Sequence, residues 1–159
     1  MTIKEITPQI IDKTDKQILE LLQDNAKLTI KEISEKTGKS QTAIRERIKR
    51  LEESLIKKYT AIIDCRKLGY KEMIMATLTV NTTHQLEDIR EQLNKIEEIK
   101  YAYVVTGDSP LFIMAKCLDH EDAMKLIVRL RNLPGVEEVK TQLVLDCIRE
   151  DHTIIIPKS

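Results

Sequence analysis

Hydrophobic and polar positions follow two different periods along the chain, and the period changes near residue 60. Before that point, apolar side chains recur every three or four residues, which is the period of an amphipathic helix. The pattern predicts helices over KTDKQILELLQDNA and LTIKEISEKTG, and a third helix that begins after GKS. The first part of the chain therefore predicts three successive helices.

Polar residues suited to capping precede each predicted helix. Thr14 with Gln17, and Thr29 with Glu32, have the spacing of a capping box, in which two side chains satisfy free backbone N–H groups. Ser40 is expected to cap the third helix, and Gly38 to end the second in the left-handed conformation that glycine tolerates. The apolar positions of the third helix fall on one side, which we expect to be buried: Ile44, Ile48, Leu51 and Leu55.

The remainder of the chain alternates between strand and helix patterns. A short strand over residues 59–63 is expected to lead out of the third helix. MIMATLTV then predicts a strand, THQLEDIREQLNKI a helix, YAYVVTG and LFIMAKC two strands, DHEDAMKLIVRLRNL a helix and VEEVKTQLVL a last strand. The order β-α-β-β-α-β is that of the ferredoxin-like fold. The predicted fold class is α+β, with an N-terminal helix-turn-helix (winged-helix-like) domain and a C-terminal βαββαβ domain.

These patterns set the expected domain boundaries and contacts. We expect a helix-turn-helix domain over residues 1–58, a connecting strand and linker over 59–70, and an assembly and effector domain over 71–159. Helices should cover one face of the sheet, while Met73, Met75 and Leu78 make the other face apolar. An apolar open face favours a homodimer through the sheets. The trailing HTIIIP is expected to add an edge strand.

Charge adds a contrast between the two parts. The chain has 26 basic and 26 acidic residues, but residues 1–60 hold 13 basic and 10 acidic ones, a net of +3, which leaves −3 for residues 61–159. Much of the positive charge lies on the third predicted helix. A basic amphipathic helix alone fits a solvated surface, but after two capped helices and a glycine turn it favours DNA. Glu46 on the same face would orient Arg45, accept from a base or repel phosphates.

Four segments in the same order resemble one family. TDKQILELLQDNAKLTIKEISEKTGKS, RERIKRLEESLIKKYTAIID, VVTGDSPLF and RLRNLPGVEEVKTQLVL are similar to successive parts of the Lrp/AsnC (feast/famine) transcriptional regulators. The resemblance implies a sequence-specific regulator that binds double-stranded DNA and assembles into dimers, then octamers or similar particles. It also implies an amino-acid effector bound by the C-terminal domain.

The residues that match the family's motifs define two expected sites. The DNA-binding residues would be Lys39, Ser40, Gln41, Thr42, Arg45, Arg47, Lys49 and Arg50, with Gln41, Thr42 and Arg45 near base edges and the basic residues on phosphates. The effector-binding residues would be Gly107, Asp108, Ser109 and Thr141. Two positions depart from the family pattern: Pro110 replaces the usual second Asp of the turn, and Val139 replaces one of two threonines. The turn is therefore either a ligand site or a plain hairpin.

Other functions have weaker support in the sequence. Siroheme decarboxylases resemble the family in both domains and are the alternative, although the second part of this chain is acidic and poor in His. We expect no catalytic site, no cofactor and no metal site, because His84, His120 and His152 are scattered. Cys65, Cys117 and Cys147 are expected to be reduced and mostly buried, in a cytoplasmic protein without a membrane segment.

Overall fold

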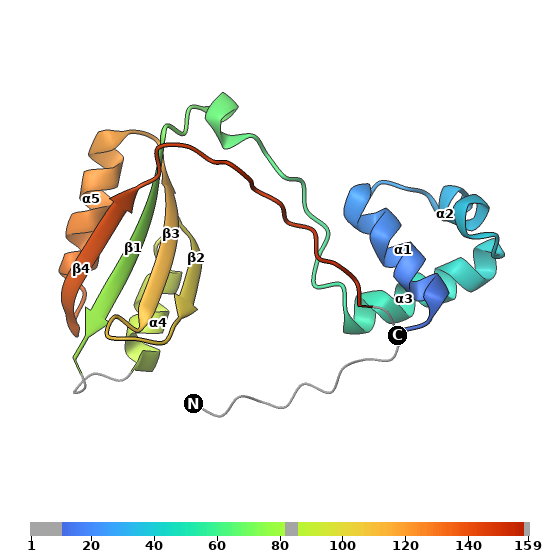
Figure 1. Ribbon diagram of the computed structural model, residues 1–159, viewed down its shortest axis with the longest axis horizontal. Helices are drawn as coiled ribbons and strands as arrows, with labels where there is room; N and C mark the ends of the chain where they lie inside the picture. Colours follow the sequence, from blue (N-terminus) through green and yellow to red (C-terminus); the bar gives the residue numbers. More distant parts are fainter. Residues whose placement is uncertain (1–10, 82–85, 158–159) are drawn as a thin grey trace. The chain divides into compact units, whose positions relative to one another are not determined.

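The computed structural model describes residues 11–81 and 86–157 of the 159-residue chain. Its contacts divide the chain into two compact units (Figure 1). The first contains the described residues up to Ile62 and those from Glu150 onward, and the second is Ile63–Arg149. The predicted boundaries had placed the last residues of the chain in the second part. His84 and the predicted helix start at residues 83–85 lie outside the described residues.

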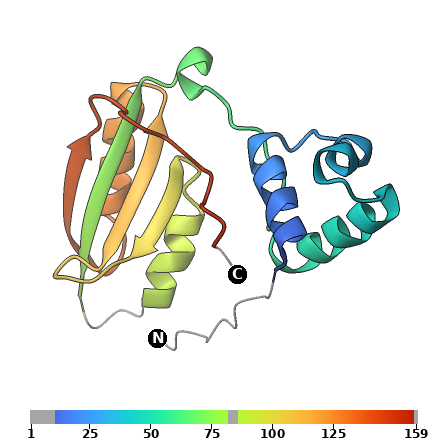
Figure 2. The same cartoon turned by 45° about the vertical axis from the view of Figure 1, so that its right-hand side comes forward.

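The first unit holds three helices, as the period of the sequence predicts: α1 (Lys13–Asp24), α2 (Ile30–Thr37) and α3 (Gln41–Ser54). Their apolar sides meet in a small core whose four buried members are Ile18, Ile33, Ile44 and Leu51. Figure 2 shows the three helices packed around this centre. Leu55 had been expected in the core, but it follows the end of α3 and is 41% exposed.

Two of the three predicted N-terminal caps are confirmed, as is the glycine predicted to end α2. Thr29 and Glu32 form a capping box, Gly38 ends α2 at φ 67°, and the Ser40 hydroxyl accepts from the Ala43 N–H. The cap of α1 was placed wrongly, because Asp12 rather than Thr14 precedes the helix. Asp12 and Asp15 exchange side-chain-to-backbone hydrogen bonds across the first turn, and this places Thr14 inside α1.

The second unit is a four-stranded antiparallel sheet with two helices. Its strands are β1 (Glu72–Val80), β2 (Ile99–Val104), β3 (Leu111–Cys117) and β4 (Val136–Leu143). Their order across the sheet is β2-β3-β1-β4, so the first and third strands are central. The helices α4 (Leu86–Asn94) and α5 (His120–Arg131) lie on the same face in both ribbon views (Figures 1 and 2). The βαββαβ prediction is confirmed.

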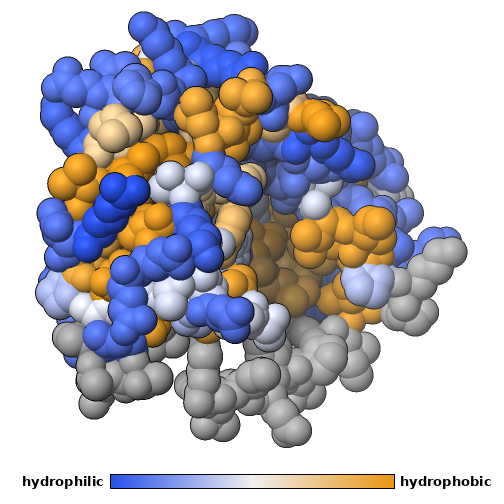
Figure 3. Space-filling view, turned by 60° about the vertical axis from the view of Figure 1, so that its left-hand side comes forward, coloured by the Kyte–Doolittle hydropathy of each residue, from blue (hydrophilic) through white to orange (hydrophobic). Residues whose placement is uncertain are grey.

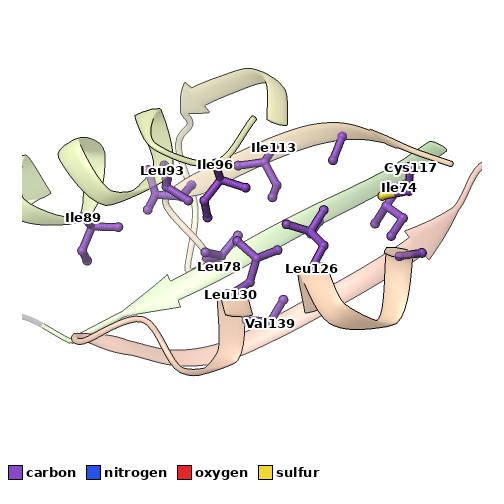
Figure 4. Packing of buried hydrophobic residues seen from close by; sticks show 14 residues of the cluster. Ile74, Leu78, Ile89, Leu93, Ile96, Ile113, Cys117, Leu126, Leu130 and Val139 are labelled. Atoms are coloured by element: carbon purple, nitrogen blue, oxygen red, sulfur yellow. The ribbon is translucent and has the colours of Figure 1, made fainter. Parts of the chain in front are cut away.

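Side-chain alternation decides which face of the sheet the helices cover. Ile74, Ala76 and Leu78 of β1 are buried toward α4 and α5, where they meet helix residues such as Ile89 and Leu126 (Figure 4). Leu78 therefore does not lie on the open face with Met73 and Met75, as had been expected, because an odd difference in position reverses the side of a strand. Met73, Met75, Thr77 and Thr79 alternate with the buried residues.

The segments on either side of the sheet differ from their predicted strands. Residues 59–63 do not form the predicted strand. A short 3-10 helix, η1 (Cys65–Leu68), follows them. The trailing residues HTIIIP are also not a strand, although they contact α1 through side-chain hydrogen bonds. Cys117 is buried as expected, but Cys65 is only half-buried and Cys147 is exposed. All three are free cysteines.

Candidate nucleic-acid interface and effector turn

The turn between α2 and α3 is held by local hydrogen bonds. Gly38 takes the left-handed conformation, and its N–H donates to the Ser34 carbonyl at 2.9 Å. The Ser34 hydroxyl donates to the Lys39 carbonyl at 2.5 Å, so the chain reverses within two residues before Ser40 caps α3. A fixed turn of this kind sets the angle at which the second helix of a helix-turn-helix leaves the first.

The outer side of α3 carries polar side chains, most of which have no side-chain partner among the described residues. Ile44 and Leu51 anchor the helix in the core and Ile48 packs against it, so the exposed side is formed by Gln41, Thr42, Arg45, Glu46 and Lys49. Among the described residues, neither Arg45 nor Lys49 forms an ion pair. The exposed predicted contacts on this side are Lys39, Ser40, Gln41, Thr42, Arg45 and Lys49. This surface is hereafter the outer face of α3.

Two of the predicted phosphate contacts have acidic partners within the unit. Arg47 donates to Asp12 at 2.6 Å and to Asp15 at 2.8 Å, and Arg50 donates to the second oxygen of Asp15 at 2.6 Å. Asp15 is only 1% exposed, whereas the Arg47 and Arg50 side chains are 27% and 54% exposed. The sequence did not indicate this acidic clamp, which we define as Asp12 and Asp15 at the start of α1 with Arg47 and Arg50 on α3.

The contacts of the clamp favour the charged forms of Asp12 and Arg47. The Asp15 backbone N–H, followed by the Arg47 guanidinium, lowers the pKa of Asp12 below its usual value. The hydrogen bonds to Asp12 and then to Asp15 raise the pKa of Arg47. Two arginines and two carboxylates give the clamp a net charge of zero. Its hydrogen bonds hold α3 against α1. Because the charges of the clamp cancel, the net positive charge of this helix lies on the outer face of α3.

The predicted effector turn joins β2 to β3 at one end of the sheet. Gly107 takes φ 113°, and the Val105 N–H donates to the Pro110 carbonyl at 2.8 Å to close the turn. Asp108 is exposed. The Ser109 hydroxyl lies 2.9 Å from the Thr79 hydroxyl on β1. Thr79 was missed from the sequence, because only the antiparallel pairing of β1 with β3 brings residues 30 positions apart together.

Thr141 does not join this turn within one chain. It is paired with Ala76 across β1 and β4, and Ala76 faces the helices. Thr79 lies three residues further along β1, about 10 Å away at strand spacing, and on the opposite face. Two pockets of ≈ 410 and ≈ 370 Å³ are lined by other residues, with Tyr70 and Lys116 in both, and neither includes a predicted effector residue.

No group of three or more His, Cys, Asp or Glu side chains among the described residues is arranged to hold a metal ion. Within the same residues, no helix has both the length and the apolar character needed to cross a membrane.

Both parts of the chain match models of known domain families. The model of the AsnC-type helix-turn-helix domain matches residues 11–52, and that of the Lrp/AsnC ligand binding domain matches residues 73–154. The chain belongs to the Lrp/AsnC family. As the family's two domains imply, it is a DNA-binding transcriptional regulator with a ligand-binding domain. The resemblance found in the four sequence segments is confirmed.

Curated relatives agree over most of their length. The HTH-type transcriptional regulator FL11 of Pyrococcus horikoshii is 34% identical over 141 residues, which are 88% of this chain and 93% of that protein. The leucine-responsive regulatory protein of Escherichia coli is 30% identical over 152 residues, 92% of each chain. These relatives are regulators rather than enzymes, so the decarboxylase alternative is not favoured.

Solved structures show the same fold at lower identity. The complex of the Neisseria meningitidis transcriptional regulator NMB0573 with L-Met has a TM-score of 0.87 at 23% identity, covering 92% of this chain and 97% of that one. Escherichia coli AsnC has a TM-score of 0.85 at 22% identity, covering 92% and 99%. The α+β architecture predicted from the sequence is confirmed by these neighbours.

Proposed function

We propose that the outer face of α3 binds the major groove of double-stranded DNA. Gln41, Thr42 and Arg45 stand at the N-terminal part of the helix, from which recognition helices contact base edges. Lys39, Ser40 and Lys49 flank them and would contact phosphates. The single observation that carries this proposal is that α3 buries its apolar side and leaves Arg45 and Lys49 exposed without acidic partners in the described residues.

The clamp residues have different roles in this proposal. Arg50 is more than half exposed and spends one terminal nitrogen on Asp15, so its other N–H groups remain for a phosphate. Arg47 is mostly covered and donates to two carboxylates, so its part in DNA binding is to hold α3 in place. Both residues are thus needed for DNA binding, and the mechanism differs between them.

We further propose that the regulator forms homodimers through the open face of the sheet, and that the dimers assemble into octamers or similar particles. Tyr101, Tyr103 and Phe112 stack on this part of the sheet, with ring centroids 6.2 and 6.5 Å apart. Met75 and Met114 are paired across β1 and β3 and lie on the same face. Figure 3 shows hydrophobic patches between hydrophilic side chains on one view of the surface. Burying such patches favours self-association.

In this proposal the protein acts in the cytoplasm and its effector is an amino acid. The amino acid binds at the Gly107–Asp108–Ser109 turn. Asp108 is exposed and suits an ammonium group, and the Ser109 and Thr79 hydroxyls suit a carboxylate. Thr141 lies too far away in the same chain, so a neighbouring copy would have to supply it. The L-Met complex of the Neisseria regulator supports the ligand class, whereas Pro110 removes one carboxylate and one N–H from the turn.

Salt-dependent DNA binding tests the proposed interface. Affinity for a fragment with the protein's own promoter would be measured at several salt concentrations for wild type, Lys49→Gln and the control Lys125→Gln, which lies on α5. Removing one phosphate contact lowers the salt slope by roughly 0.9 per subunit. We expect this change for Lys49→Gln and none for Lys125→Gln. Equal slopes for the two variants would show that the outer face of α3 does not hold the phosphates.

Assembly and effector binding need separate measurements. Sedimentation of wild type and Met75→Lys would show whether the open face joins subunits, since a lysine there would disrupt the dimer.

Calorimetric titration with a panel of amino acids, on wild type and Asp108→Asn, would test the turn. An amino acid that binds both proteins equally would place the ligand elsewhere.

A further inference from the structure

The chain returns to the first unit near its C-terminus. The Ile154 backbone N–H donates to the Gln23 side-chain oxygen at 2.7 Å, and the Gln23 side-chain nitrogen donates to the Ile154 carbonyl at 3.1 Å. One side-chain amide on α1 thereby satisfies both backbone groups of a residue 131 positions away. A neighbouring strand would satisfy the same two groups, so Gln23 takes the place of a strand partner.

The side chains of this segment confirm that it is docked in one orientation. Three consecutive isoleucines have very different exposures: 69% for Ile154, 94% for Ile155 and 7% for Ile156. A free extended segment would expose all three alike. Just before them, the Asp151 carboxylate accepts from the Thr153 N–H at 2.9 Å and from its hydroxyl at 2.8 Å, which shapes the approach to α1.

We propose that residues 150–157, hereafter the docking tail, are an integral part of the DNA-binding unit and bind α1 of their own chain through Gln23 and Ile156. The inference rests on the proposed function, because α1 also carries the carboxylates of the clamp that holds α3. A tail that stabilises α1 therefore supports the position of the recognition helix, although the two lie at opposite ends of the sequence.

The docking tail gives the DNA-binding unit a second covalent connection to the sheet. The chain leaves the first unit after Ile62 and enters it again at Glu150. Only residues 144–149 separate the tail from the end of β4, which carries Thr141. A ligand-induced shift of β4 would thus reach α1 through six residues. We expect variants that release the tail to weaken the effect of an effector on DNA binding.

Three variants of the full-length protein separate docking from general surface effects. Gln23→Leu removes both amide hydrogen bonds, Ile156→Ala removes the buried side chain, and Ile155→Ala is the matched control at the neighbouring exposed position. Hydrogen exchange followed by mass spectrometry would report residues 152–156 and α1 without any DNA present. DNA affinity and its salt slope would be measured on the same preparations.

The expected result is faster exchange in the tail and at the C-terminal end of α1, by at least about tenfold in Gln23→Leu and Ile156→Ala. The first variant loses both hydrogen bonds to Ile154 and the second loses a mostly buried side chain. DNA affinity should fall in the same two variants with an unchanged salt slope, and Ile155→Ala should match wild type. Unchanged exchange in both variants would overturn the docking. Faster exchange with wild-type DNA affinity would overturn the tail's role in the DNA-binding unit.

Two further outcomes keep this inference separate from its premises. If wild type bound no DNA specifically while the exchange results held, the proposed function would fail and the docking would stand. Isotope-labelled chains lacking residues 150–159, assembled with intact unlabelled chains, would test the source of the tail. Restored protection of α1 in the labelled chains would show that a second copy supplies it, and would overturn the same-chain assignment.

Discussion

Replacing Asp15 by Asn tests the acidic clamp most directly. The change keeps the size of the side chain and removes its charge, which at 1% exposure is almost wholly out of water. Removing one partner of a buried ion pair costs about 3–5 kcal/mol, because the other partner keeps an uncompensated charge. Here Arg47 retains Asp12 at 2.6 Å and Arg50 is half exposed, so the expected loss is at the lower end, about 3 kcal/mol.

That loss should concentrate in the first unit. One kcal/mol shifts the melting temperature of a domain of this size by about 4–8 °C, so a loss of 3 kcal/mol predicts a decrease of roughly 12–24 °C. Urea unfolding followed by hydrogen exchange mass spectrometry would report α1 and α3 separately from β3, which is the internal reference. The control is Asp24→Asn, at the exposed C-terminal end of α1, where loss of a negative charge is neutral or slightly stabilising.

A double-mutant cycle identifies the interaction responsible. If Asp15 acts through Arg47, then Asp15→Asn combined with Arg47→Gln should cost clearly less than the sum of the single changes. DNA affinity should fall with stability in all three proteins. A change below about 0.5 kcal/mol in Asp15→Asn, the range of ordinary surface substitutions, would refute the structural role of the clamp.

Four other predictions follow from the charge or burial of single groups. Folding lowers the pKa of Asp12 below its unfolded value of 3.8. The stability that the Asp12 carboxylate adds is therefore present above pH 3.8 and is lost as pH falls through the lower, folded pKa. An acid titration of stability in Asp12→Asn should lack this loss. Burial, and then nearby carboxylates, raise the pKa of the Cys117 thiol from 9.0 to about 11. Because the thiol ionises at lower pH in the unfolded chain, the second unit should lose stability between pH 9 and pH 11 in a circular-dichroism titration. This loss should be absent in Cys117→Ala. In thiol labelling at pH 7, exposed Cys147 should react well before Cys117, and equal rates would contradict the buried position. Ile113→Ala should cost about 2–5 kcal/mol in urea unfolding because Ile113 is fully buried, and a cost below 1 kcal/mol would argue against the core described here.

Features that depend on neighbouring residues could be predicted from the sequence. The Thr29 box, the Ser40 cap and the Gly38 turn all involve groups within a few positions of one another. The bounds of β3 agree with LFIMAKC at both ends, because an apolar run lies between a proline and a polar helix start. The error at Thr14 has the same local origin, since Asp12 and Asp15 offered a second capping box three residues apart.

Features that depend on distant pairings were missed. The Gln23–Ile154 contact spans 131 positions and the Thr79–Ser109 contact spans 30, and no periodicity links such residues. Asp15 did leave a signal, because it stands three residues before Ile18 and so lies on the buried stripe of α1. A charged residue on a buried stripe requires a partner. The sequence could therefore have indicated that some basic residue of α3 was already committed to α1.

The clamp also changes the number of charges that the helix offers to DNA. Five basic residues lie between Lys39 and Arg50, which by itself suggests a salt slope of about −4.5 per subunit. Arg47 and Arg50 are balanced by two carboxylates, so a phosphate that Arg50 contacts with its remaining N–H groups gains no net positive charge. The net charge available therefore comes from Lys39, Arg45 and Lys49, which predicts a slope nearer −2.7. Fluorescence anisotropy with one DNA site across a salt series would measure it. A slope near −4.5 would mean that phosphates take Arg47 and Arg50 away from their carboxylates, and that the clamp opens on binding. A slope near −2.7 that steepens in Asp15→Asn would show that the buried carboxylate limits how strongly this helix attracts DNA of any sequence. Contacts with bases would then supply a larger share of the affinity.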